Sequence, residues 1–325
     1  MSRPGLEEQL AALETLRTGP ASPAPVDQLR RALGGRQNLV VAKAAAVAAH
    51  LGCRDLVPDL VAAFDRALAG EAKADPQCWA KNALAKALVA LGHYEPEIFL
   101  RGSRHVQPEP VWGGRQDTAA TLRGTCVLAL PACRIGPLEA LTRMAELLAD
   151  PEAPVRRDAA RAIAQLGLPE GVPLLRLKAL AGDREPEVTG HCLTALVGLQ
   201  PREALDFVAG FLSYGDPDVR MEAVAALCES HEAPAASHLE RYWSRLTDPE
   251  AKRTVLALAG ASPLPEMGEF LLGVVAEANA AAGAAALEAL AAGRFRAVLR
   301  DRAAACVRER GEPALRQAFA QVFEE

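Results

Sequence analysis

The segment Val155-Arg-Arg-Asp-Ala-Ala-Arg-Ala-Ile-Ala-Gln-Leu-Gly167 decides the fold, because the chain repeats its pattern many times. Residues 40–52 and 80–92 align with it without a gap. From residue 122 to about residue 290 the copies follow one another every 28 to 33 residues or so. The remaining copies begin at Leu122, Val188, Val219 and Ala251, and a degenerate copy lies near Asn279.

Each copy predicts an amphipathic helix. Apolar or small residues recur at relative positions 0, 4, 5, 8 and 11, which is one stripe of an α-helix. In the best copy the stripe consists of Val155, Ala159, Ala160, Ile163 and Leu166.

The turns between copies predict helix ends. An Asp precedes the later copies, and an Asp side chain can cap a helix by accepting hydrogen bonds from its free N–H groups. Gly92 and Gly167 fit the left-handed position just after a helix. A second helical stretch, such as 172–180 or 204–212, lies between copies. The expected turn residues are Asp150-Pro151, Asp183, Asp216-Pro217 and Asp248-Pro249.

One repeat is therefore two antiparallel helices, and neither pair can bury its apolar stripe alone. Stacked pairs share one continuous core, so we predict an all-α fold, an α-solenoid. Composition agrees, because 50 % of the 325 residues are hydrophobic and only 4 % are aromatic, which suits a thin core of small side chains. The net charge of −5 excludes a protein that coats DNA through a generally basic surface.

Residues 147–163 and 214–227 resemble HEAT repeats, especially the short HEAT-like repeats described in phycobilin lyases. The resemblance covers about residues 26–292 and implies a fold but no single activity, since the family includes scaffolds, adaptors and a few enzymes. It also implies a ladder between neighbouring repeats, formed by the turn Asp and the Arg that follows the first Val. Asp150, Arg156, Asp216 and Arg220 fit that ladder, whereas Asp183 with Thr189 and Asp248 with Lys252 fit it only partly.

Three segments break the period and define the expected organisation. Residues 1–25 predict a helical arm followed by a Pro-rich linker. Residues 26–292 form the solenoid, with an irregular loop at about 102–117. Residues 293–325 predict terminal capping helices rich in Arg, whose alternative role is docking of an acidic partner.

The 102–117 loop concentrates polar and aromatic chemistry. Pro108, Pro110, Gly113 and Gly114 argue against a helix over 102–116, and long loops inside compact arrays are often functional. Either the loop binds a ligand, or its Trp packs onto the solenoid and its polar residues hold its backbone; a His105–Glu109 acid–base pair is a third possibility. The candidate binding residues are His105, Gln107, Glu109, Trp112, Arg115 and Asp117.

A second candidate surface follows from the helix stripe. In HEAT proteins the second helix of each pair usually lines the concave face, and its non-core positions here carry charges of both signs. Such a strip suits a peptide or protein segment better than a polyanion. The candidates are Lys86, Thr125, Arg157, Asp158, Arg161, His191, Glu222 and Arg253.

Motifs for chemistry are few. The six His and seven Cys show no metal-ligand spacing, so neither a metal nor another cofactor is predicted. An odd number of scattered Cys, no stretch of 18 apolar residues and no signal peptide favour a cytoplasmic protein of the bacterial HEAT-like kind. A HEAT-fold DNA alkylpurine glycosylase would use Trp and Asp residues, for which Trp79, Trp112, Trp243 and Asp117 are available, although Trp79 is expected in the core.

We therefore expect a non-catalytic scaffold or adaptor that binds a protein or peptide partner on its concave face, with the 102–117 loop as a specificity element. The alternative is a HEAT-fold enzyme, glycosylase-like or lyase-like, that uses the loop. That alternative requires His105, Glu109, Trp112 and Asp117 to converge in one pocket.

Overall fold

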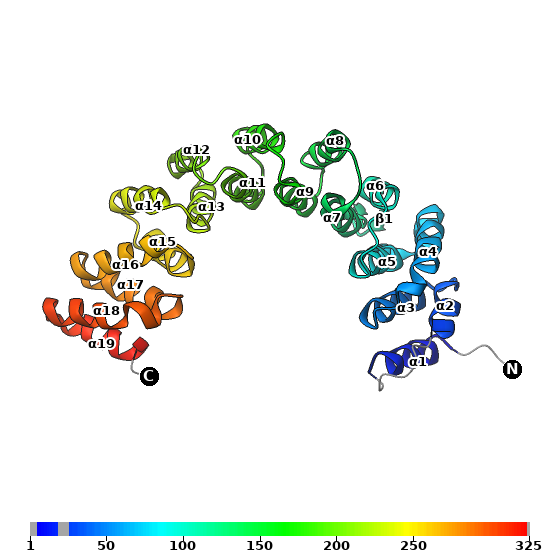
Figure 1. The fold of residues 1–325 in the computed structure, drawn as a ribbon, viewed down its shortest axis with the longest axis horizontal. Coiled ribbons are helices and arrows are strands. Elements are labelled where there is room, and N and C mark those ends of the chain that lie inside the picture. Colours follow the sequence, from blue (N-terminus) through cyan, green and yellow to red (C-terminus); the bar gives the residue numbers. More distant parts are fainter. Residues whose placement is uncertain (1–4, 19–25, 324–325) are drawn as a thin grey trace. The chain divides into compact units, whose positions relative to one another are not determined.

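The computed structural model describes residues 5–18 and 26–323, and it divides into two compact units, residues 1–166 and 167–325. Each unit consists of antiparallel helix pairs, so the predicted all-α solenoid is confirmed (Figure 1).

The N-terminal unit holds nine α-helices and one β-hairpin among its described residues. Its elements are α1 (Leu6–Thr18), α2 (Val26–Leu33), α3 (Asn38–His50), α4 (Val57–Ala69), α5 (Trp79–Ala90), α6 (Pro96–Arg104), β1 (Pro108–Val111), β2 (Gly114–Asp117), α7 (Ala120–Ala129), α8 (Pro137–Leu147) and α9 (Ala153–Leu166), with 3₁₀ turns η1 (Arg54–Leu56), η2 (Ala72–Ala74), η3 (Pro76–Cys78) and η4 (Leu130–Ala132).

The C-terminal unit continues with helix pairs. Its elements are α10 (Gly171–Ala181), α11 (Pro186–Leu199), α12 (Leu205–Gly210), η5 (Phe211–Ser213), α13 (Pro217–Cys228), α14 (Pro234–Arg245), α15 (Pro249–Ala261), α16 (Pro265–Glu277), α17 (Ala280–Ala292), α18 (Arg296–Arg310) and α19 (Pro313–Phe323).

Every copy of the sequence pattern forms the second helix of a pair. In the N-terminal unit α3, α5, α7 and α9 pack against one another in succession, and in the C-terminal unit α11, α13, α15, α17 and α19 do the same. We call these helices, with α1, the first row, and the even-numbered helices the second row (Figure 1). The stripe is the core, since Val155, Ala159, Ala160 and Ile163 are fully buried, while Leu166 at its end is half-buried.

The turn residues cap helices as the sequence predicts. Asp216 accepts a hydrogen bond from the Asp218 amide at the start of α13, and Asp248 accepts from two amides at the start of α15. Gly92 and Gly167 have φ values of +73° and +71°, a conformation that disfavours residues with a Cβ.

The expected arm differs from the structure. Helix α1 packs against α3, and the Lys43 ammonium pairs with the Glu14 carboxylate between them, so the first helix belongs to the stack. Most of the predicted Pro-rich linker, residues 19–25, lies outside the described residues.

The first of the Arg-rich C-terminal helices, α18, is bonded to α16. Arg302 pairs with Glu269 of α16 at 2.6 and 2.7 Å, and Arg310 donates to the Val275 carbonyl at 2.8 Å. These bonds fasten α18 onto α16, while Arg300 and Arg308 form no hydrogen bond or ion pair with other described residues.

Candidate functional site

The irregular loop expected over 102–117 is in fact helical as far as Arg104 and then forms a β-hairpin that ends at Asp117. Helix α6 continues to Arg104, and β1 pairs antiparallel with β2, Pro108 opposite Asp117 and Val111 opposite Gly114. Pro108 and Pro110 are tolerated in β1 because the outer edge of a two-stranded ribbon pairs with no further strand, so a missing N–H there costs no ladder hydrogen bond. Gly113, with φ at +88°, closes the turn beside Trp112.

Two polar side chains fix the base of the hairpin. Gln107 is 3 % exposed, and its amide nitrogen donates to the Asp75 carbonyl at 2.9 Å and to Glu109 Oε1 at 2.6 Å. The same Glu109 oxygen accepts from the Gln77 amide and from the Thr118 hydroxyl, both at 2.7 Å. These hydrogen bonds hold the pKa of Glu109 below its usual value, with those from Gln107 and Thr118 as the main causes. Glu109 therefore joins the hairpin to the turn that precedes α5.

A buried lysine lies beneath this base. Lys81 is completely buried, and its Nζ lies 3.3 Å from Asp75 Oδ2 and 2.9 Å from Gln107 Oε1. Asp75 also accepts from the amides of Ala80 and Lys81 at the start of α5, where a carboxylate is favoured by the helix dipole. The ammonium is thus paired and hydrogen-bonded, as a buried charge requires.

Arg123 connects the hairpin to the next repeat. Its guanidinium is 2 % exposed and makes two bonds to Asp150, at 2.8 and 2.9 Å, one to Asp117 at 2.5 Å and one to the His105 carbonyl at 3.0 Å. Helix α7 thereby bridges the end of β2 and the turn before α9. This is the ladder that the family resemblance implied, and it confirms Asp150 as a member.

Electrostatics at Asp117 follow from this bridge. Burial alone would raise the pKa of Asp117, but hydrogen bonds from the Gln107 and Ala119 amides and from Arg123 outweigh burial, so the pKa lies below its usual value. Likewise, burial would lower the pKa of Arg123, but its carboxylate partners raise it. Both groups therefore carry their charges in the folded protein.

Elsewhere the expected ladder is corrected. Arg220 donates to the carbonyls of Tyr214 and Gly215 within its own turn, and Asp216 caps its own helix. Neither residue joins neighbouring repeats, because Asp216 lies three residues before the repeat start rather than five. Arg156 donates to the carbonyls of Asp150 and Pro151.

The sequence hypothesis overlooked the buried half of this site. Asp75, Lys81 and Arg123 were not among the candidates, although a signal existed. Each basic residue stands one position after a repeat start, with an Asp five positions before that start, as in Asp150 with Arg156.

Trp112 points away from this network. It is fully exposed at the hairpin tip, at 103 % relative exposure, and its neighbour Val111 is 45 % exposed. The alternative in which Trp112 packs onto the solenoid is therefore wrong, whereas the polar residues do hold the backbone as that alternative required. Arg115 adds a bond from its guanidinium to the Pro108 carbonyl at 2.8 Å.

The proposed acid–base pair is not formed. His105 Nε2 lies 3.4 Å from Gln107 Oε1, and burial lowers the His105 pKa. One Glu109 oxygen is occupied by three donors and Asp117 is held by Arg123, while Trp112 faces solvent. The four residues on which the enzyme alternative depended do not converge in one pocket.

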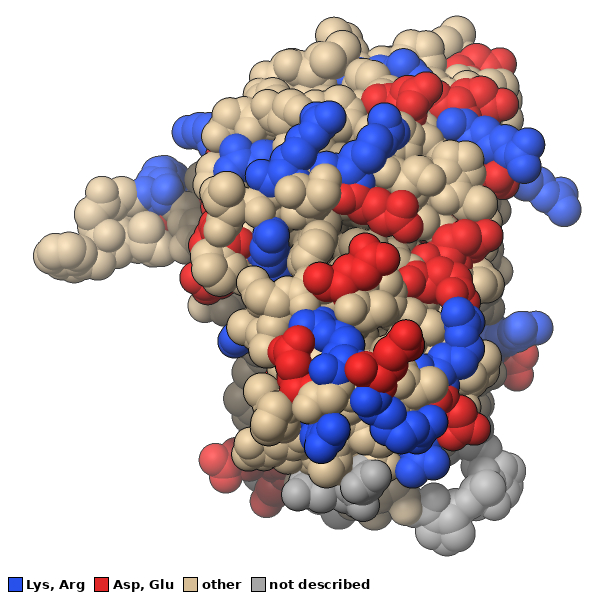
Figure 2. Space-filling view, turned by 90° about the vertical axis from the view of Figure 1, so that its left-hand side faces the viewer, with Lys and Arg blue, Asp and Glu red and all other residues tan. Residues whose placement is uncertain are grey.

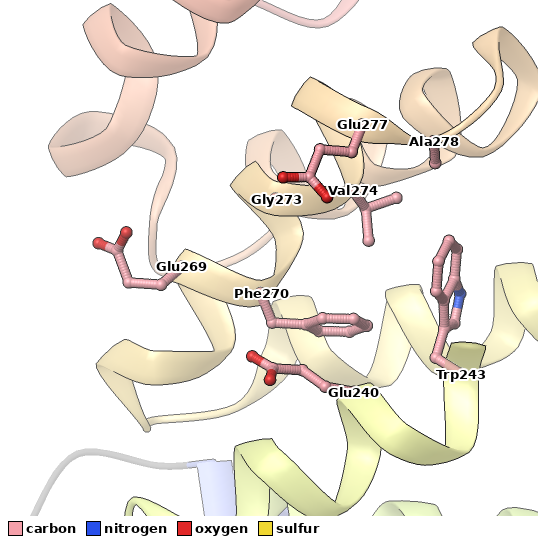
Figure 3. Close-up of a pocket in the computed structure, with 8 residues that line it drawn as sticks. All are labelled: Glu240, Trp243, Glu269, Phe270, Gly273, Val274, Glu277 and Ala278. Carbon is pink, nitrogen blue, oxygen red and sulfur yellow. The ribbon is translucent and has the colours of Figure 1, made fainter. Parts of the chain in front are cut away.

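The other tryptophans lie elsewhere. Trp79, expected in the core, is 54 % exposed at the start of α5. Trp243 packs edge-on against Phe270, with ring centroids 6.0 Å apart, beside a pocket of about 400 Å³ between α14 and α16. Figure 3 shows Glu240, Glu269 and Glu277 around this pocket, whose acidic lining is unsuited to a nucleic acid.

The predicted concave-face residues all lie on first-row helices, and none is buried. Lys86 is on α5, Thr125 on α7, His191 on α11 and Arg253 on α15. The others are Arg157, Asp158 and Arg161 on α9 and Glu222 on α13.

Two of these carboxylates cover glycines of the preceding first-row helix. A Cβ at Gly124 would lie 2.4 Å from Asp158 Oδ2, and one at Gly190 would lie 1.9 Å from Glu222 Oε2. Burial, with Glu187 and Asp218 nearby, raises the pKa of Glu222. These glycines allow neighbouring helices to approach with a charged side chain between them.

Within residues 5–18 and 26–323, no cluster of three or more His, Cys, Asp or Glu side chains is placed to hold a metal ion. No helix in the same ranges has the length and hydrophobicity needed to cross a membrane.

The comparison with protein families decides the class of repeat. The family model for HEAT repeats matches residues 175–259. Residues 175–259 are therefore similar to HEAT repeats. The match spans most of α10 to α15, and the same sequence pattern recurs in the N-terminal unit.

Solved structures agree on the fold. Kap121p, described as a karyopherin bound to the SUMO protease Ulp1p, is 13 % identical, with a TM-score of 0.52 over 96 % of this chain and 39 % of Kap121p. YibA of E. coli is 17 % identical, with a TM-score of 0.47 over 85 % of this chain and 92 % of YibA. No curated protein matches. At this identity the likeness to Kap121p shows an α-solenoid fold and no activity.

Proposed function

We propose that this chain is a scaffold or adaptor that binds a protein or peptide segment along its first row of helices, with the hairpin as a specificity element. The observation that carries the proposal is Trp112, fully exposed at the tip of a hairpin whose base is fixed by buried ion pairs. Kap121p, a protein of similar fold, has been crystallised with protein partners, which supports this class of function.

A rigidly held Trp is an effective anchor for a partner. Burying its ring would remove about 150–250 Å² from water, which at about 25 cal/mol/Å² contributes at most about 4–6 kcal/mol. The ordering cost is small because the bonds of Glu109 and Arg123 already fix the hairpin. Tryptophan is also among the residues most often found at binding hot spots.

The charges on the first row favour a protein over a nucleic acid. On α9 of the N-terminal unit, Arg161 lies 3.4 Å from Asp158, so a positive group stands beside a negative one. Figure 2 shows a different face, the left-hand side of Figure 1, and on it too Lys and Arg are interspersed with Asp and Glu. A polyanion would meet repulsion at each carboxylate.

Quantitative affinity capture from the native host tests the proposal. We would compare the wild type with Trp112→Ala and with Arg157→Glu/Arg161→Glu, using circular dichroism to verify folding. The matched controls are Leu138→Ala, an apolar side chain 79 % exposed on α8, and Arg134→Glu, an exposed charge before α8.

We expect one protein to be depleted at least about tenfold by Trp112→Ala, and also by the double charge reversal, but retained by both controls. Equal recovery of every captured protein by all five chains would overturn the assignment of this surface. We propose no second function, because Glu109 and Asp117 are held in hydrogen bonds at the hairpin base while Trp112 is exposed at its tip.

A further inference from the structure

A second pocket, distinct from the hairpin and the first row, has the chemistry of an anion site. It lies between α12–η5 and α14 in the C-terminal unit and has a volume of about 350 Å³. Arg241, Arg245 and His238 line it from α14, and Asp206 and Ser213 line it from the opposite side. This pocket is on the second row, so it is no part of the partner surface proposed above.

One arginine is held in place there. The Arg241 Nε donates to the Ser237 carbonyl at 3.2 Å, and its Nη2 lies 2.9 Å from His238 Nδ1. On the other side of the imidazole, His238 Nε2 lies 3.3 Å from Asp206 Oδ1. The arrangement requires Nδ1 to accept and Nε2 to carry the proton, so His238 is a neutral positioning residue, and Arg241 Nη1 stays available.

The second arginine is unpaired. Arg245 is one helical turn beyond Arg241, on the same face of α14, and forms no hydrogen bond or ion pair with any residue in the described part of the chain. The Ser213 hydroxyl is likewise without a partner in that part. Two guanidinium groups and a hydroxyl thus face one cavity with unused donors.

The acidic group in the pocket does not cancel this charge. The side chain of Asp206 is 96 % exposed, so water and salt screen it, and its contact is with His238. Planar guanidinium forks match the oxygen spacing of phosphate and bind it through paired N–H···O bonds.

We propose that this pocket binds a phosphate group, through Arg241 and Arg245 with Ser213 as a third donor. The shared ligand chemistry is a tetrahedral oxyanion, which a free phosphate ion or a phosphate monoester on an amino acid would both supply.

The test is isothermal titration of the full chain with inorganic phosphate, and separately with N-acetyl-O-phosphoserine amide, at constant ionic strength. The informative variant is Arg241→Lys/Arg245→Lys, which keeps both charges but removes the fork geometry. The matched control is Arg300→Lys/Arg308→Lys on α18, whose two arginines are also exposed and unpaired in the described structure.

We expect saturable 1:1 binding to the wild type, weakened at least about tenfold in the α14 double variant and unchanged in the α18 control. Asp206→Asn should tighten binding about two- to fivefold, because it removes the carboxylate that repels the ligand. Tighter binding of the phosphoserine compound would identify a monoester as the ligand, and binding of the inorganic ion alone would identify free phosphate.

Two results would overturn the proposal. One is no saturable binding of either compound to the wild type. The other is equal affinity of the wild type and the α14 double variant, which would mean diffuse attraction between charges rather than a site. Asp206→Asn is expected to gain affinity for phosphate, so its result cannot be explained by a variant that fails to fold.

Discussion

Replacement of Arg123 by Met is the most informative perturbation of the hairpin support. The change removes four hydrogen bonds and leaves the carboxylates of Asp150 and Asp117, whose side chains are 7 % and 17 % exposed, without their cation. Breaking a buried ion pair by removing one partner typically costs about 3–5 kcal/mol. We expect Arg123→Met to destabilise the protein by about that amount.

Urea denaturation followed by circular dichroism measures the global part of this loss. Hydrogen exchange of the amides of residues 105–118 measures the local part, and a loss of about 3 kcal/mol corresponds to roughly 100-fold faster exchange. The triple variant Arg123→Met/Asp117→Asn/Asp150→Asn removes the uncompensated charges and should recover part of the stability.

Acid provides an independent check. The folded pKa of Asp117 is lowered, so its contribution to stability is present above its unfolded pKa and is lost as pH falls through the folded pKa. The difference in the free energy of unfolding between wild type and Arg123→Met should therefore shrink as pH falls below 3.8, the ordinary pKa of an aspartate. An Arg123→Met variant that stays within about 1 kcal/mol of the wild type and leaves hairpin exchange unchanged would contradict this role of Arg123.

Three further predictions concern single positions. Glu109→Ala deprives three donors of their acceptor and should accelerate hairpin exchange with a cost of about 1–3 kcal/mol, which exchange mass spectrometry would detect. Trp112→Ala should change the free energy of unfolding by less than about 0.5 kcal/mol, because the ring contacts nothing; a larger effect in urea denaturation would mean that the ring packs on the protein. Gly190→Ala should cost about 1–3 kcal/mol, because the new Cβ would lie 1.9 Å from Glu222 Oε2 and 2.9 Å from Glu222 Cβ. Glu222→Gly removes both contacts, so the urea midpoint should fall less when Gly190→Ala is made in a Glu222→Gly chain than in the wild type; an equal fall would contradict the clash.

The regular part of the fold was predictable because it depends on local periodicity. Val155, Ala159, Ala160 and Ile163 carry the 3.6-residue pattern, and each copy of it forms a first-row helix as expected. The left-handed conformation expected for Gly167 after the helix is also confirmed, with φ at +71°.

The hairpin and its support were less predictable, for a physical reason. Pro108, Pro110 and the Gly113-Gly114 pair predict no helix over 102–116, which is correct from residue 105 onward but wrong over 102–104, where α6 ends. They also do not distinguish an irregular loop from a short two-stranded ribbon whose edges are free. Lys81 and Arg123 follow repeat starts, where charged residues are expected on the surface. Their burial depends on carboxylates from other turns, which only the packed structure brings within reach.

The sequence left two alternatives open for the Trp112 ring, which could either bind a ligand or pack onto the solenoid. The ring is fully exposed, which contradicts packing onto the solenoid, whereas ligand binding stays a prediction. The sequence also did not show which residues belong to the charged ladder. Asp117 was predicted to bind a ligand, whereas the structure shows it paired with Arg123.

Site-specific photo-crosslinking in the native host tests most directly whether this surface meets a partner. Trp112→p-benzoylphenylalanine and Arg161→p-benzoylphenylalanine would be compared with the same change at Leu138 on the second row. We expect one and the same protein to be crosslinked from positions 112 and 161 and not from 138. Identical products from all three positions, or no product from position 112, would contradict it.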